Sequence, residues 1–233
     1  MLVCGELRDG PNIYEWWNPR AYAECSAQSW NPNADYNEFM NEVGFSWNVF
    51  ADFTIGVLEW GTDHGYCLLW GSFAAGNPDY PAWYDLVRVI EYADTHPCGI
   101  NADGTPRYHG MALHQPLYMP PDIARGEWVL NDHIVARHLR VDAIVRALTG
   151  RGLADHPGGQ VWFTEYGLHD GYSGSWSDEF SCDEIARSYW YSAKVLTDTA
   201  PFVRGYHYWT FGDANSIWTD DQRCAATIAA YAP

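Results

Sequence analysis

The chain has 233 residues, with 30 Asp and Glu against 13 Lys and Arg, and a formal net charge of −17 at pH 7. This charge repels phosphate backbones and anionic lipid, which argues against nucleic-acid binding and membrane-surface roles. No apolar run approaches the ~18 residues that a membrane-spanning helix needs, so we expect one domain over residues 1–233 that acts on a neutral partner.

Short apolar runs alternate with amphipathic segments along the chain, which is the pattern of strand–helix units around a parallel sheet. In chain order, the predicted strands are 2–4, 67–73, 111–114, 161–164 and 203–211. Apolar residues at helical spacing predict helices around 35–43, 83–90 and 134–141. The capping signature S/T-x-x-E/Q predicts further helix starts at Ser181 and Thr219. The segments 99–107 and 150–159 are predicted to be polar loops.

About five strand–helix units therefore fit into the chain. A parallel sheet of that size belongs either to a doubly wound domain or to part of an eight-stranded barrel, and periodicity alone does not choose between them. The side chains at the strand ends carry the distinguishing information. We find no G-x-S-x-G, G-x-G-x-x-G or Walker pattern at a strand end, which disfavours a doubly wound hydrolase or nucleotide-binding domain.

The aromatic content is high, with 13 Trp, 16 Tyr and 9 Phe. Several Trp residues stand beside Gly, Asn or Pro, as in the segments 15–19 and 175–177, which is typical of loops. Flat rings on loops can serve as platforms for the C–H face of a pyranose, although packing under long loops explains each single Trp equally well.

The six cysteines include no CxxC pair and no Cys/His spacing typical of a zinc site. Their even number permits disulfides in an oxidising compartment, and buried free thiols are an equal alternative. The first residues, 1–5, show no basic or long apolar region, so no signal peptide is visible.

A carboxylate follows the apolar run 161–164, where Glu165 begins the segment Glu-Tyr-Gly. In a barrel, the active site forms at the C-terminal ends of the strands. A Glu at such a position costs desolvation energy unless it has partners or a function, so we expect Glu165 to be catalytic. A structural ion pair is the alternative.

Two segments resemble clan A glycoside hydrolases, which are retaining enzymes with a (β/α)8 barrel. Trp-Phe-Thr-Glu-Tyr-Gly at 162–167 resembles the seventh barrel strand, whose Glu is the nucleophile, and 203–213 resembles the eighth, whose Trp lines the sugar pocket. The resemblance implies that Glu165 is the nucleophile and that Trp209 and Tyr166 contact substrate.

The same resemblance implies that the acid/base Glu ends the fourth strand, usually after an Asn. The predicted strand 2–4 leads to Glu6, and the following Pro-Asn…Trp run contains Asn12 and Trp17 as substrate contacts. We therefore expect Glu6 to be the acid/base. Gly5 stands where the clan has Asn, so Asp9 and Glu15 stay open as alternatives.

Strand six of the resemblance corresponds to 110–118, where His114 and Tyr118 are implied to contact the substrate. The two stand four residues apart, whereas two is commoner in the clan, and a core histidine is an equal alternative for His114. Strand five corresponds to 67–73, where Trp70 could face either way.

Together these features predict a retaining glycosidase without metal or cofactor, whose two carboxyls lie ~5–5.5 Å apart. A non-catalytic carbohydrate-binding barrel that has lost its acid/base is the alternative. The fold expected is an α/β barrel of the (β/α)8 type that is incomplete at its N-terminus, since strands four to eight are present. We expect a secreted or extracellular protein that degrades polysaccharide. The sugar, the linkage, endo or exo action, disulfide pairing and oligomeric state stay open.

Overall fold

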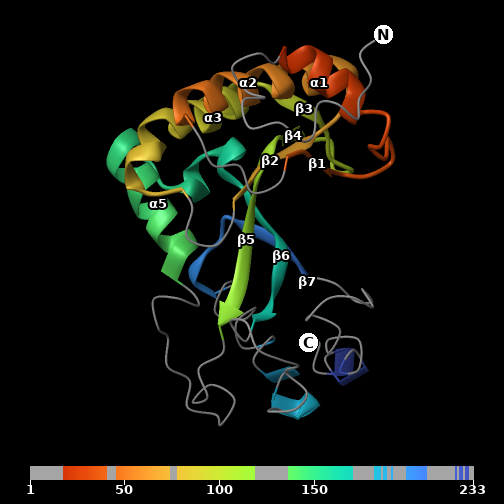
Figure 1. The fold of residues 1–233 in the computed structure, drawn as a ribbon, viewed down its shortest axis with the longest axis vertical. Coiled ribbons are helices and arrows are strands. Elements are labelled where there is room, and N and C mark those ends of the chain that lie inside the picture. Colours follow the sequence, from red (N-terminus) through yellow and green to blue (C-terminus); the bar gives the residue numbers. More distant parts are fainter. Residues whose placement is uncertain are drawn as a thin grey trace. The chain divides into compact units, whose positions relative to one another are not determined.

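The computed structural model describes residues 18–40, 46–73, 78–118, 136–169 and 198–208, with shorter stretches at 181–184, 186–187, 190, 224, 226–227 and 229–230. Its main feature is an open, parallel, five-stranded sheet in the order β1-β2-β5-β6-β7 (Figure 1). The strands are β1 (Asn37–Glu38), β2 (Leu68–Phe73), β5 (Gly110–Tyr118), β6 (Val161–His169) and β7 (Val203–Tyr208). The α/β class is thus confirmed, whereas a closed barrel is not shown by the described residues.

Four predicted strands are confirmed as β2, β5, β6 and β7. The predicted strand 2–4 lies outside the described residues. The predicted helices at 83–90 and 134–141 correspond to α3 (Trp83–Thr95) and α5 (Ala136–Thr149). The helix predicted around 35–43 is wrong, because this segment contains β1, which pairs in parallel with β2 through Asn37–Leu68 and Glu38–Leu69.

The chain divides into two compact units, one formed by 1–112 with 143–161 and the other by 113–142 with 162–233. In the first unit, all six residues of β2 are buried. The helices α2 (Trp47–His64) and α3 lie side by side in this unit (Figure 1). Its largest fully buried side chains include Phe50, Trp70 and Trp83.

The helix α2 ends in a glycine cap. Gly65 has φ +75°, and the main-chain NH of Tyr66 donates to the carbonyl of Gly61 at 2.8 Å. This left-handed conformation suits Gly because it has no Cβ, and it closes the last helical turn. Earlier in the helix, Gly56 lets α1 (Pro19–Ser26) approach closely, since an added Cβ would lie 2.6 Å from Pro19 Cγ.

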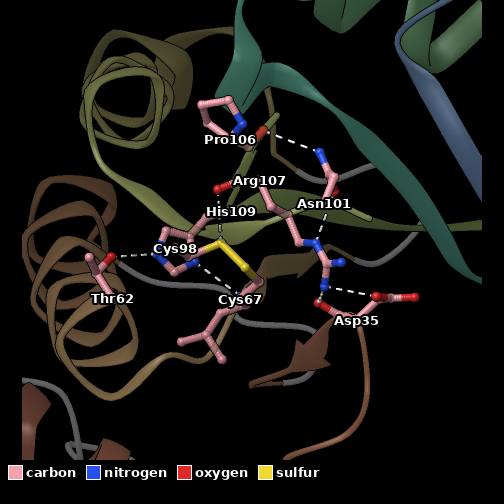
Figure 2. Close-up of a disulfide and its surroundings, with 9 residues drawn as sticks. Asp35, Thr62, Cys67, Cys98, Asn101, Pro106, Arg107 and His109 are labelled. Atoms are coloured by element: carbon pink, nitrogen blue, oxygen red, sulfur yellow. Dashed lines mark hydrogen bonds and ion pairs between the residues drawn. A yellow bond between two sulfur atoms is a disulfide. The ribbon is translucent and has the colours of Figure 1, made fainter. Parts of the chain in front are cut away.

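A disulfide joins the start of β2 to a small hairpin (Figure 2). Cys67 pairs with Cys98 on β3 (Pro97–Ile100), which forms an antiparallel pair with β4 (Pro106–Tyr108). The segment predicted as the polar loop 99–107 is therefore a hairpin, and only its tip is a turn.

The buried ring of His109 fastens this hairpin to β2 and α2 (Figure 2). Its Nδ1 accepts a hydrogen bond from the main-chain NH of Leu68 at 3.0 Å, and its Nε2 lies 2.9 Å from Thr62 Oγ1. This accounts for both ring nitrogens. Burial lowers the pKa of His109 to about 4, so the ring is neutral at ordinary pH.

A second buried histidine in this unit, His156, is the centre of a cluster of hydrogen bonds. His156 Nδ1 lies 2.6 Å from Asp94 Oδ2, and its Nε2 lies 3.1 Å from Thr149 Oγ1. Asp94 also accepts from the main-chain NH of Gly158 at 2.9 Å and pairs with Arg151 at 3.1 Å. These contacts tie the end of α3 to the end of α5 and to the segment before β6. The predicted polar loop 150–159 is thus ordered by two short 3-10 turns, η4 (Leu153–Asp155) and η5 (Pro157–Gly159).

The second unit carries the other described disulfide, Cys182–Cys224, and Cys25 of the first unit is disulfide-bonded as well. For these cysteines the disulfide alternative is confirmed, which fits an oxidising compartment. The capping box at Ser181 is also confirmed: its NH donates to Glu184 Oε2 at 2.8 Å, and the NH of Glu184 donates to Ser181 Oγ at 3.3 Å. The start at Thr219 lies outside the described residues. No helix in the described ranges is both long and apolar enough to cross a membrane.

Candidate functional site

Three neighbouring strands of the sheet bear most of the sequence-predicted site residues. His114 and Tyr118 belong to β5, Glu165 and Tyr166 belong to β6, and Trp209 directly follows the last residue of β7. Because β5, β6 and β7 are consecutive in the sheet, their backbones are brought together. The sequence placed Glu165 just after a strand, but β6 continues to His169, so Glu165 is the fifth of its nine residues.

The side chains of the predicted catalytic pair, Glu6 and Glu165, lie outside what the structure describes. For Glu165, Tyr166 and Tyr118 the structure describes the backbone but not the side chains. Glu6, Asn12, Trp17 and Trp209 lie outside the described residues altogether. The predicted separation of ~5–5.5 Å between the Glu6 and Glu165 carboxyls therefore stays a prediction.

His114 is the one predicted site residue whose side chain the structure describes. It is the fifth of nine residues in β5, and only 2% of it is exposed. The preceding residues 111–113 are buried as well. The core position expected for the alternative interpretation is thus present, and contact of His114 with a substrate stays a prediction.

The strand β6 has two different faces before it reaches Glu165. Val161 and Phe163 are fully buried, whereas Trp162 and Thr164 are partly exposed. The ring of Trp162 lies against Gly205 on β7, where an added Cβ would meet its Cδ1 at 3.1 Å. A larger residue at 205 would push this ring away.

Phe163 packs on a buried histidine of α5. The rings of His138 and Phe163 meet edge to face with centroids 5.6 Å apart, and Phe202 lies 6.0 Å from the same histidine. Neither ring nitrogen of His138 has a hydrogen-bond partner among the described residues. Burial lowers its pKa to about 4, and the nearby Asp142 opposes this shift only in part. This apolar contact makes His138 a packing residue beneath β6.

The position beside β2 is occupied by β1, a strand that the sequence pattern did not predict. Its last residue, Glu38, is exposed, and Glu38 Oε1 accepts a hydrogen bond of 2.5 Å from Ser72 Oγ of β2. Ser72 is fully buried with φ +42°, and Gly71 before it has φ +103°. A carboxylate thus ends β1 against a strained position near the end of β2.

A sequence signal for this strand was available. The dipeptide Asn41-Glu42 follows Met40, two residues after the end of β1, and it has the Asn-Glu order that the resembled family usually shows at its fourth strand, although Val43 stands where that family has Pro. Asn41 and Glu42 themselves lie outside the described residues. The helical interpretation of 35–43 concealed this signal.

No group of three or more metal-ligating side chains forms within the part of the chain that the structure describes. Comparison with known proteins adds no relative: no protein-family model, no curated protein and no solved structure matches the chain.

Proposed function

We propose that the chain is the catalytic part of a retaining glycoside hydrolase, with Glu165 as its nucleophile. The observation that carries the proposal is the order of β2, β5, β6 and β7, which follow one another in the sheet as they do in the chain. Consecutive units of a (β/α)8 barrel have this order, and we propose that the sheet belongs to such a barrel. The motif Trp-Phe-Thr-Glu-Tyr-Gly lies within β6. In the sheet, β6 lies between β5, which contains Tyr118, and β7, which directly precedes Trp209 in the chain.

The proposed reaction uses two carboxyls in two steps. The Glu165 carboxylate attacks the anomeric carbon, while the acid/base donates its proton to the leaving oxygen, so that a glycosyl-enzyme ester forms and the aglycone departs. The same acid/base, now ionised, removes a proton from water, which attacks the ester and releases the sugar with retained configuration. The side chains supply all proton transfers in this scheme.

Four residues are candidates for the acid/base role. The sequence predicts Glu6, with Asp9 and Glu15 as alternatives. The place of β1 beside β2 supports Glu42 as a further candidate, because the acid/base belongs to the strand preceding β2 and Glu42 follows β1 after an Asn. We propose that one of Glu6 and Glu42 protonates the leaving group, and we retain both for testing.

The test uses aryl glycosides with good and poor leaving groups. Glu165→Ala should abolish turnover, and azide should restore part of it by replacing the missing nucleophile. The acid/base variant, Glu6→Ala or Glu42→Ala, should lose far more activity on poor leaving groups, which need protonation, than on good ones. Glu59→Ala, an exposed Glu on α2, serves as the matched control and should retain activity.

Two results would contradict this proposal. Full turnover by Glu165→Ala would remove the nucleophile assignment, and equal losses on both leaving groups in Glu6→Ala and Glu42→Ala would remove both acid/base candidates. Carbohydrate binding without hydrolysis by the native chain would instead favour the non-catalytic carbohydrate-binding protein. The disulfides support secretion as the setting of this activity.

A further inference from the structure

Two exposed tyrosines meet at the start of α3. Within the described residues, the exposed large apolar side chains are Tyr80, Tyr84 and Ile100, with exposed fractions of 48%, 61% and 65%. Tyr80 and Tyr84 contact each other edge to face, with centroids 5.6 Å apart and planes at 87°. Their hydroxyl oxygens lie 3.3 Å apart. The two most exposed aromatic side chains of the described residues thus lie in contact with each other.

The backbone that carries this pair belongs to a 3-10 turn and to the start of a helix. Tyr80 begins the 3-10 turn η3 (Tyr80–Ala82), in which Pro81 restricts the chain, and Tyr84 lies in the first turn of α3. Between them, Trp83 is fully buried, and its ring lies 6.3 Å from that of Phe73, the last residue of β2. The anchored Trp83 therefore presents the two tyrosine rings to solvent at the segment that follows the C-terminal end of β2.

We propose that Tyr80 and Tyr84 form a binding platform for a neutral glycan chain, which would make a polysaccharide the substrate class of this protein. This inference rests on the proposed glycosidase function, because it supplies that function with a polymer-binding subsite. Tyrosine suits the role because its ring offers an apolar face to the C–H face of a pyranose and its hydroxyl can donate to or accept from sugar hydroxyls.

The net charge of the protein indicates which class of polymer the tyrosine pair can bind. A net charge of −17 disfavours nucleic acids and acidic glycans, since like charges repel at long range. A neutral chain incurs no such repulsion.

The test measures binding separately from hydrolysis. Full-length chains migrate through native gels that contain xylan, glucomannan, mixed-linkage β-glucan or galactan, and retardation by each polymer gives the affinity. The Tyr80→Ala/Tyr84→Ala double variant should bind about ten- to a hundredfold more weakly than the native chain, because each ring contributes about three- to tenfold. Tyr80→Phe/Tyr84→Phe keeps the rings and should retain most of the binding. Ile100→Ala removes an exposed apolar residue elsewhere and should bind like the native chain. Equal urea midpoints among the variants exclude unfolding as the cause.

Kinetics on two substrates then locate the effect. The Tyr→Ala pair should lower kcat/KM on the retained polymer about ten- to a hundredfold while leaving turnover of an aryl monoglycoside unchanged. Unaltered retardation of the double variant, or no retardation of the native chain by any of these polymers, would overturn the platform. A different result would separate the two proposals. If the native chain shows no hydrolysis, and the Tyr80→Ala/Tyr84→Ala variant nevertheless loses polymer binding, the platform stands and the glycosidase proposal fails.

Discussion

Acid should destabilise this protein through His109, and the size of the effect follows from the burial of the ring. The NH of Leu68 donates to Nδ1, so Nδ1 can hold no proton without losing this bond. Nε2 then carries the hydrogen and donates to Thr62 Oγ1 at 2.9 Å. In a protonated ring, the Nδ1–H would point at the N–H of Leu68, so that two donors would face each other inside the core. Burial adds the cost of desolvating the charge.

The sign of the pH dependence follows from the lowered pKa. Burial lowers the pKa of His109 from the ordinary 6.5 to about 4, so the unfolded chain takes up its proton at higher pH than the folded chain. The contribution of His109 to stability is therefore complete above pH 6.5 and is lost as the pH falls towards 4. The whole difference corresponds to about 3 kcal/mol, of which about 2 kcal/mol is lost between pH 8 and pH 5.

The assay is urea unfolding followed by Trp fluorescence at pH 8, 7, 6 and 5. His109→Asn replaces the Nδ1 acceptor with an amide oxygen that can accept from the Leu68 NH, and the Asn side chain does not titrate in this range. The stability difference between pH 8 and pH 5 should therefore shrink by about 2 kcal/mol in this variant. Thr62→Val is the matched control, because it breaks the same network, keeps the imidazole and should keep the pH dependence. Identical pH dependence in His109→Asn and the native chain would refute this account.

Three further changes should lower the urea midpoint. Cys67→Ser/Cys98→Ser opens a disulfide between residues 31 apart and should cost about 3–4 kcal/mol of the free energy of unfolding, so that a reducing agent lowers the urea midpoint of the variant less than that of the native chain. Asp94→Asn weakens the buried contact to His156 and should cost about 2–4 kcal/mol; a change below 0.5 kcal/mol would show that the contact is not stabilising. Gly71→Ala places a Cβ 2.7 Å from the Phe73 ring at φ +103° and should cost about 2 kcal/mol or more, whereas Gly104→Ala, at φ +84° with open space around it, should cost less.

The sheet was largely predictable from the sequence because its strands are buried along their length. All six residues of β2 and residues 111–114 of β5 are buried, so they stand out as apolar runs between polar segments. The alternation on β6 was weaker, and its C-terminal half was missed because Glu165, Tyr166 and Gly167 break the apolar run. Strand ends that carry polar residues are the part that apolar periodicity detects least well.

Among the elements that escaped prediction, β1 and α2 did so for different physical reasons. The segment around β1 has Tyr36, Phe39, Met40 and Val43 at the spacing of a helical face, and only the pairing with β2 shows that it is extended. The helix α2 buries residues around much of its circumference and its first residue has no side-chain cap, so it has neither a clear polar face nor a start signal. In both cases tertiary contacts decide what local spacing leaves ambiguous.

The candidate site depends even more on tertiary contacts, because its strain has no sequence signature. Among the described residues, Met40 and Ser72 are the non-glycine residues with positive φ, at +64° and +42°. Each such residue costs about 1–3 kcal/mol, a cost that stability alone would not maintain. Met40 lies two residues after the end of β1, and Ser72 is the fifth of the six residues of β2. The hydroxyl of Ser72 donates to Glu38 Oε1 at 2.5 Å. In a (β/α)8 barrel, the carboxyl ends of the strands are the face on which active sites form. If the proposed glycosidase function holds, the end of β1 is therefore the place in this unit where Glu42 should be tested as the acid/base.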